Sequence, residues 1–309
     1  MKASRGMTWV VSALLIVCML CSALVLRHID HMRPAAPIEE VLYISSPKVL
    51  KRLSLGYDGL LADIYWTRVV QYFGAKHFEG AQHYDLLAPL LTLTTALDPH
   101  LVVAYEFGAN FLAPKPPGGA GQPLQAIQLA EFGIRNNPHE WRLYYDLGFI
   151  YYMELHDYKD AAAAFEAGSH VPKAHPYLKL MAALMAEHAG EIQTARVLWM
   201  TTYQTTPDRS IRANAAAHLR ALQVDEDVTT LEALGVRYRQ KTGHSPESFS
   251  DLQAAGLLRG TPIDPLGQPY KLVAAGRVEV RDPDDLPFIE KGTPPGYVAP
   301  LKPKFLPTD

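Results

Sequence analysis

Cysteine is almost absent from this chain of 309 residues. The two cysteines, Cys18 and Cys21, both lie in one apolar run near the N-terminus. The sequence after residue 26 therefore has no thiol for a disulfide bond, a thiolate metal site or a cysteine nucleophile.

An excess of charge of either sign is also absent. Lys and Arg together number 29 and Asp and Glu number 32, which gives a formal net charge of -3. No block of five or six like charges occurs, so the basic patch of a general nucleic-acid binder is missing. We predict that the chain has no nucleic-acid partner.

The motifs of common catalytic and metal sites are missing too. No Gly-x-Ser-x-Gly occurs, and the glycine-rich segment 118–121 lacks the Lys-Ser/Thr of a phosphate loop, which predicts a flexible loop between helices. The acidic run 225–227 is expected to favour the N-terminal dipole of a following helix. We expect no catalytic site, metal, cofactor or small-molecule ligand. The closest histidine pairs lack a third ligand nearby: His28 and His31, His77 and His83, and His170 and His175.

The longest apolar run, Met7 to Leu26, has 20 residues without a charge. A helix of this length is about 30 Å long and matches the hydrocarbon core of a bilayer. A cleavable signal peptide would have a shorter core, and a lipoprotein would have a small residue where Val17 and Leu20 precede the cysteines. We predict an uncleaved signal anchor within residues 1–33, a spacer over 34–45, and export of the rest of the chain.

Amphipathic helices are predicted from Ser46 to about Arg239, with breaks at Pro, Gly and Asn-Pro signals. Ser46 precedes the first helix, and Asp58 begins a second that is predicted to end at Gly74. A pattern then recurs that consists of a small residue, a position four later, a small residue three beyond that and a proline about five further on. Successive prolines of this pattern are 34 and 35 residues apart. The three copies are Ala126, Ala130, Gly133 and Pro138; Ala161, Phe165, Gly168 and Pro172; and Ala195, Trp199, Thr202 and Pro207.

Together with Tyr144, Leu147, Gly148 and Tyr151 upstream of the second copy, this pattern resembles the tetratricopeptide repeat family over residues 65–207. The resemblance implies helix pairs stacked in a right-handed superhelix, with small residues where paired helices touch. An insertion at 113–123 separates the helices of one unit.

The resemblance also implies a groove along the first helix of each pair, which would hold a protein partner. An aromatic wall there suits an apolar or proline-containing peptide, and the paired Lys and Asn of a carboxylate clamp are missing. Two alternatives stay open: the rings pack against neighbouring helices, or the C-terminal module covers them. The predicted groove residues are Tyr105, Arg142, Tyr145, Phe149 and Tyr152, with Ala109 and Leu112 beside Tyr105.

The C-terminal part changes character. Helices are predicted over 210–222 and 228–241, then a type I turn over 264–267 and a β-hairpin of strands 270–273 and 277–281. Residues 232–281 resemble the C-terminal region of pseudopilins. The expected units are a tetratricopeptide-like solenoid (46–224), a helix and β-hairpin module (225–281) and a proline-rich extended tail (282–309).

These features predict a mainly α protein with an N-terminal transmembrane helix and a small α+β module. We expect a non-enzymatic scaffold, anchored by a single span in the bacterial inner membrane with its bulk in the periplasm. It would hold a protein partner of an envelope assembly, with a secretion or pilus-like apparatus as one candidate. The alternative function is an accessory subunit that stabilises a membrane enzyme complex.

Overall fold

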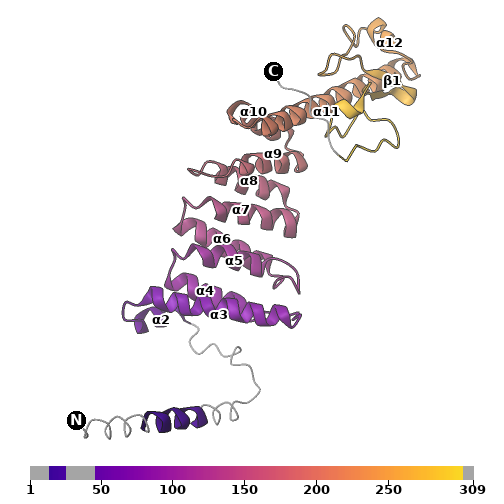
Figure 1. The fold of residues 1–309 in the computed structure, drawn as a ribbon. Helices are drawn as coiled ribbons and strands as arrows, with labels where there is room; N and C mark the ends of the chain where they lie inside the picture. Colours follow the sequence, from indigo (N-terminus) through magenta and orange to yellow (C-terminus); the bar gives the residue numbers. More distant parts are fainter. Residues whose placement is uncertain (1–13, 26–45, 302–309) are drawn as a thin grey trace, which may run out of the picture.

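The structure, a computed structural model, describes residues 14–25 and 46–301. From residue 46 the chain forms a stack of helix pairs, which leads through one long helix into a small C-terminal module (Figure 1). The mainly α fold with a small C-terminal hairpin is thus confirmed.

The predicted membrane span lies partly outside the described residues. Residues 14–25 are helical with exposed side chains, and the remainder of 7–26 is not described. Among the described helices, none combines the length and the apolar character needed to cross a bilayer. The predicted spacer at 34–45 and the last residues of the tail, 302–309, also lie outside the described residues.

Four helix pairs make up the helical stack, and each pair has a first and a second helix. Helix α2 (Pro47–Leu53) precedes them, and the π-helical turn η2 (Tyr151–Leu155) extends α7. The pairs are α3 (Asp58–Phe78) with α4 (Leu87–Leu97), α5 (Val102–Leu112) with α6 (Pro123–Asn136), α7 (Trp141–Ile150) with α8 (Tyr158–Ser169), and α9 (Tyr177–His188) with α10 (Ile192–Thr205).

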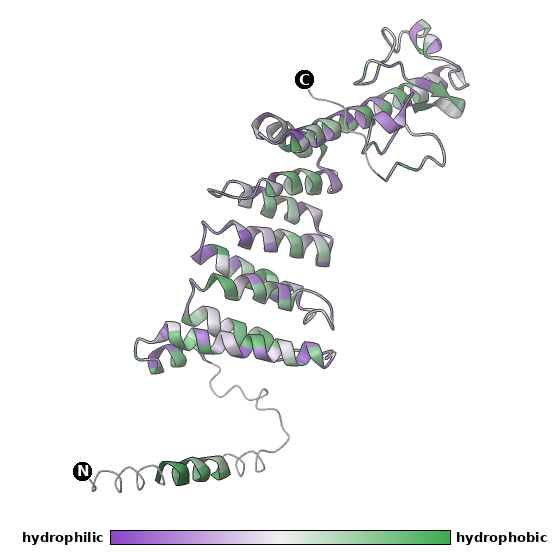
Figure 2. Cartoon of the chain, in the orientation of Figure 1, coloured by the Kyte–Doolittle hydropathy of each residue, from purple (hydrophilic) through white to green (hydrophobic). Residues whose placement is uncertain are grey.

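Each second helix ends two or three residues before a proline, as the repeat pattern predicts. Proline lacks the N–H that would continue the helical ladder, so Pro99, Pro138 and Pro172 each mark a turn to the next pair, and Pro207 marks the turn to the long helix that follows the stack. Hydrophobic residues run along every helix of the stack, and hydrophilic residues occupy many of the connecting loops (Figure 2).

Glycine allows the close approach of paired helices. A Cβ atom on Gly148 of α7 would lie 2.7 Å from the ring of Phe165 in α8, and one on Gly168 would lie 2.6 Å from the Cβ of Tyr144. Neither distance is possible between real atoms, so these two positions require glycine. The predicted role of small residues at the helix contacts is confirmed at both positions.

Two predicted helix ends are wrong. Helix α3 continues past Gly74 to Phe78. Gly74 is exposed, and a Cβ there would meet nothing within 4 Å, so the position neither needs glycine nor ends the helix. The helices predicted over 210–222 and 228–241 are one helix, α11 (Arg209–Thr242), which crosses the predicted border between solenoid and module.

The acidic run 225–227 lies in the middle of α11, not at a helix start. Asp225 accepts hydrogen bonds from the backbone N–H groups of Glu290 and Lys291, at 3.0 and 2.7 Å. Asp227 accepts one from the Tyr270 hydroxyl at 3.0 Å. The carboxylates therefore fasten the C-terminal module to the middle of a helix, and the expected role at a helix N-terminus is wrong.

The C-terminal module packs on the second half of α11. It contains α12 (Phe249–Ala254), with a capping box between Ser248 and Asp251, and a hairpin of β1 (Lys271–Val273) and β2 (Arg277–Glu279). The strands are antiparallel, and the predicted hairpin is confirmed. Its core residues come from α11, the hairpin and the tail: Val224, Val228, Leu231, Tyr270, Val278, Val280 and Leu286.

The described part of the tail, 282–301, lies against α11. Phe288 stacks on His218 with ring centroids 4.0 Å apart, and His218 stacks on Trp199 at 4.1 Å on its other face. Glu187 of α9 accepts hydrogen bonds from the Trp199 indole and pairs with His218 at 3.0 Å. This arrangement joins α9, α10, α11 and the tail at the end of the helical stack.

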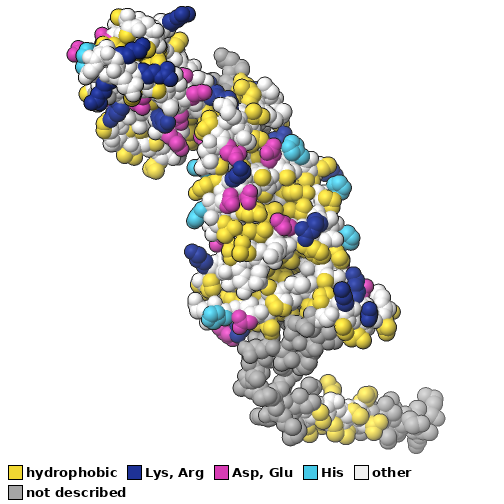
Figure 3. Space-filling model, turned by 180° about the vertical axis from the view of Figure 1, so that it is seen from behind, with side chains coloured by type: hydrophobic (Ala, Val, Ile, Leu, Met, Phe, Trp, Pro, Cys, Tyr) yellow, Lys and Arg dark blue, Asp and Glu magenta, His cyan; other side chains and the backbone are white. Residues whose placement is uncertain are grey.

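The surfaces of the two parts differ. From behind, hydrophobic side chains gather over the middle of the helical stack, and Lys and Arg side chains gather over the C-terminal module (Figure 3). Exposed basic residues of the module include Arg237, Arg239, Lys241 and Arg259.

Candidate functional site

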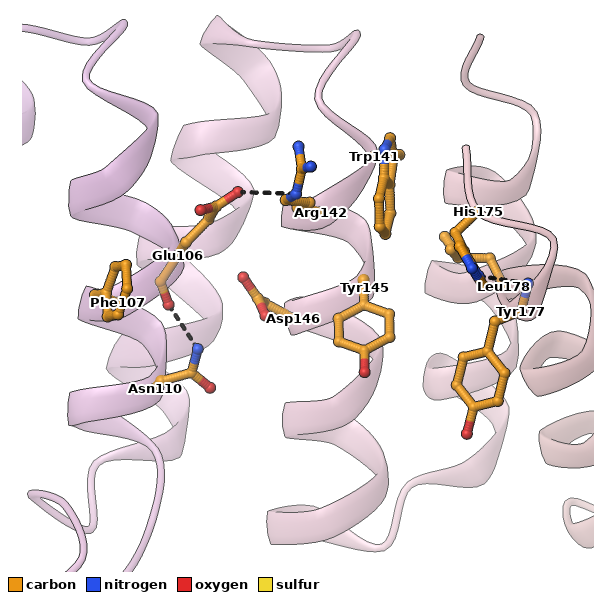
Figure 4. Close-up of a pocket in the computed structure, with 10 residues that line it drawn as sticks. All are labelled: Glu106, Phe107, Asn110, Trp141, Arg142, Tyr145, Asp146, His175, Tyr177 and Leu178. Carbon is orange, nitrogen blue, oxygen red and sulfur yellow. Dashed lines mark hydrogen bonds and ion pairs between the residues drawn. The ribbon is translucent and has the colours of Figure 1, made fainter. Parts of the chain in front are cut away.

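A cavity of about 430 Å³ opens between the first helices of three successive pairs, α5, α7 and α9 (Figure 4). This size is in the range of ligand-binding clefts. Its walls combine aromatic rings, two carboxylates and one guanidinium. We call it the A pocket, and its lining residues are Glu106, Phe107, Asn110, Trp141, Arg142, Tyr145, Asp146, His175, Tyr177 and Leu178.

Helix α7 carries an aromatic row through the A pocket. Trp141, Tyr145, Phe149 and Tyr152 are four, four and three residues apart, so the helical repeat places them on one face. The rings of Trp141 and Tyr145 meet edge to face with their centroids 6.3 Å apart. The ring centroids of Tyr145 and Phe149 are 4.6 Å apart. The end of the row at Trp141 and Tyr145 lines the cavity.

The A pocket contains more negative than positive side chains. Arg142 lies 4.0 Å from Glu106 but only 2.9 Å from Glu140, and its guanidinium stands 4.9 Å over the Trp141 ring. Asp146 forms no ion pair with any residue of the described chain. Figure 4 shows the carboxylates of Glu106 and Asp146 on facing helices, both directed into the space between α5 and α7.

This environment shifts the titration of both carboxyl groups. Burial, reinforced by the negative charge of Glu106, raises the pKa of Asp146 to about 7, although the Asn110 amide opposes the shift. Burial also raises the pKa of Glu106, against the effect of Arg142. The A pocket therefore holds a carboxyl group that ionises near neutral pH and has no cation of its own.

The predicted groove residues divide into three groups. Arg142 and Tyr145 line the A pocket. Phe149 and Tyr152 continue the aromatic row beyond it, where Phe149 packs on Phe165 at 5.3 Å and Tyr152 on Tyr158 at 6.1 Å. The first open alternative thus applies in part, since these two rings pack against neighbouring helices. The second does not apply to the cavity, because no described residue of the C-terminal module lines it.

Tyr105 is the third case, and its assignment to the groove is wrong. Its side chain is fully buried, and its hydroxyl donates to the carbonyl of Pro99 at 3.1 Å. Tyr144 makes the same bond to Pro138 at 3.3 Å, so Tyr105 is equivalent to Tyr144, not to Tyr145. The insertion obscures the register between the two units, and the predicted assignment is off by one residue. Ala109 and Leu112, placed in the groove by the same register, are buried as well.

The corrected register identifies the residues that the sequence analysis missed. Glu106 stands where α7 has Tyr145, and Phe107 stands where it has Asp146. A weak signal existed for Trp141, which lies one turn before Tyr145 on the same helix face. Helix α9 adds Tyr177, whose ring centroid is 6.5 Å from that of Tyr145.

The glycine-rich segment 118–121, expected to be a flexible loop, lies in a connection between α5 and α6 that is held in place. The carbonyl of Pro117 accepts a hydrogen bond from the Tyr84 hydroxyl at 3.0 Å and lies 2.8 Å from Nδ1 of His77. A Cβ on Gly119 would lie 2.7 Å from the carbonyl oxygen of Pro114, so this glycine lets the loop fold back on itself. The glycines therefore serve packing of the loop.

Other candidate sites are weaker. In the part of the chain that the structure describes, no three His, Cys, Asp or Glu side chains are grouped so that they could hold a metal ion. A second hollow lies between α4 and α6, and its lining includes Gln128 and Arg135. The A pocket differs from this hollow because several aromatic rings and two carboxylates line it. No protein-family model matches the chain, and no curated protein matches its sequence.

Proposed function

We propose that this chain is a membrane-anchored scaffold of the tetratricopeptide type, whose A pocket and aromatic row bind an extended segment of a partner protein. The observation that carries the proposal is the position of the A pocket on the first helices of three successive pairs. A stack of helix pairs provides a long surface without chemistry of its own, and exposed aromatic rings on it suit peptide binding.

The exposure of the rings supports this use of the surface. Phe107 is 51% exposed and Tyr177 is 39% exposed, although both are large apolar side chains that burial would stabilise. Trp66 of α3 lies 6.4 Å from Phe107 and extends the aromatic surface to the first pair. A bound peptide would cover these rings and gain their burial energy.

The membrane attachment in this proposal comes from the apolar run 7–26. Basic residues flank the run on both sides, and the proposal places the helical stack on the periplasmic side of the membrane. The partner would then belong to a bacterial envelope assembly, with the pseudopilin-like segment 232–281 favouring a secretion or pilus-like apparatus. No catalytic role is proposed.

Affinity purification from membranes in mild detergent tests this function. We expect the wild-type chain to retain a defined protein partner, and the double substitution Tyr145→Ala and Phe149→Ala to lose it. Gln128→Ala, in the hollow between α4 and α6, is the control and should retain the partner.

The identity of the retained proteins separates the alternatives. Secretion or pilus components support the scaffold, and a redox or transport complex supports an accessory subunit. A correctly folded double variant that retains the same partner would remove the aromatic row from the binding surface.

A further inference from the structure

The A pocket has a composition that selects among ligands. Two carboxylates face a single guanidinium, and this guanidinium lies closer to Glu140 than to Glu106. An acidic ligand would meet Asp146 and Glu106 together, and a neutral apolar ligand would leave the half-buried Asp146 without a counter-ion. Charge therefore favours a cation.

The aromatic walls favour the same class. A cation over the face of a tryptophan or tyrosine ring is attracted by the ring quadrupole. Arg142 already stands over the Trp141 ring in this way, and Tyr145 and Tyr177 present further rings to the cavity (Figure 4). Because no described group of side chains fits a metal ion, an organic cation is the better match.

We propose that the A pocket binds a lysine or arginine side chain presented by an extended segment of the partner protein. This inference rests on the proposed function, because it takes the aromatic row as a peptide-binding surface. The charged end would lie between Glu106 and Asp146, and the aliphatic stem would lie against Tyr145 and Tyr177. Side chains of the partner segment on either side would contact Phe107 and Phe149.

Selection of heptapeptides from a random library on the full-length chain in detergent micelles tests the proposal. We expect the wild-type chain to enrich peptides that contain lysine or arginine. Asp146→Asn should weaken the best of these at least ten-fold, because it keeps the shape of the side chain and removes its charge. Norleucine in place of the basic residue should have the same effect. Glu131→Gln, an exposed carboxylate on α6, is the matched control and should change nothing.

Binding should also strengthen with rising pH. A bound cation favours ionised Asp146, whose pKa is about 7 in the unliganded chain, so affinity should rise about ten-fold between about pH 6 and pH 8. The Asp146→Asn variant retains His175, which also lines the A pocket, so a flat profile in that variant assigns the effect to Asp146. The titratable and charged groups around Asp146 are Glu106 from α5, Arg142 and Tyr145 from α7, His175 from the loop before α9, and Tyr177 from α9.

Three other results would contradict parts of this proposal. Enriched peptides without a basic residue, or equal binding by the wild-type and Asp146→Asn chains, would overturn the cationic ligand and leave a peptide-binding surface. Binding of free butylammonium as tight as that of the selected peptide would overturn a partner protein as its source. A library that yields no binding peptide would overturn both this inference and the proposed function.

Discussion

Asp146 is a carboxyl group placed where water solvates it poorly. Burial and the neighbouring Glu106 both disfavour its charge, and Arg142 is engaged by Glu140. Its folded-state pKa is raised, so the folded chain binds more protons than the unfolded chain between the two pKa values. The stability that protonated Asp146 allows is therefore present below about pH 4 and is lost as the pH rises towards 7.

Asp146→Asn should remove this dependence. When the pH rises from about 5 to about 8, the free energy of unfolding of the wild type should fall by about 2 kcal/mol relative to that of the variant. Urea unfolding followed by circular dichroism at both pH values measures it. Parallel pH profiles for the two chains would show that Asp146 titrates as an ordinary exposed carboxyl group.

Alanine substitutions at two helical glycines should change the stability of the chain in opposite directions. Gly168→Ala should destabilise the chain by about 1 to 3 kcal/mol, because its Cβ would overlap the Cβ of Tyr144, which cannot move without its backbone. Gly74→Ala should stabilise the chain by about 0.5 to 1 kcal/mol, because alanine fits an exposed helical position better than glycine. Chemical denaturation of both variants checks this, and equal effects of the same sign would contradict the assigned packing.

At the residue scale, sequence periodicity identified part of the site. The resemblance to the tetratricopeptide repeat family, applied within the one unit that contains Tyr144, implied Arg142 and Tyr145, and both line the A pocket. The assignment of Tyr105 is wrong by one residue, because it requires the register between two units and the insertion 113–123 lengthens one of them. One residue changes the helix face by about 100°, enough to exchange a buried position for one in the cavity.

At the scale of elements, α11 joins the helical stack to the C-terminal module. Its first half carries His218 between Trp199 and Phe288, and its second half packs under the hairpin. Phe288 adopts a φ of 73°, a conformation that is rare for residues other than glycine. The ring stack therefore holds this part of the tail in a backbone conformation that it would not adopt by itself.

Phe288→Ala should release the tail from α11. Loss of the ring contact costs about 1 kcal/mol or more, so we expect faster proteolysis within residues 282–301 and a change in Trp199 fluorescence. Phe78→Ala is the matched control, because Phe78 is 94% exposed. Cleavage rates that are equal in both variants would mean that other contacts hold the tail.

The elements themselves were largely predictable. Proline and glycine signals located the helix pairs, and Asp264 and Gly267 located the turn before the hairpin, where the Gly267 N–H donates to the Asp264 carbonyl at 2.8 Å. The continuity of α11 was not predictable, because an acidic run reads as a helix start unless its partners are known. Those partners, Tyr270 and the backbone at 290–291, lie more than 40 residues away.

At the scale of the whole molecule, the proposed attachment to the membrane depends on residues 7–26. A chain that lacks residues 1–33 should move from the membrane pellet to the soluble fraction after carbonate extraction, because the apolar run proposed to hold it in the bilayer has been removed. The full-length chain should stay in the pellet. A soluble full-length chain would contradict the anchor.

The central claim is that the first helices of the stack present the binding surface. Photo-crosslinking in intact cells tests it directly, with a photoreactive amino acid at Phe107 in the A pocket or, as the control, at Gln128 between α4 and α6. We expect a single major crosslinked protein from position Phe107 and none from Gln128. The substitution Tyr145→Ala should lower the yield of the crosslink at Phe107. The same crosslinked protein from both positions, or from Gln128 alone, would contradict it.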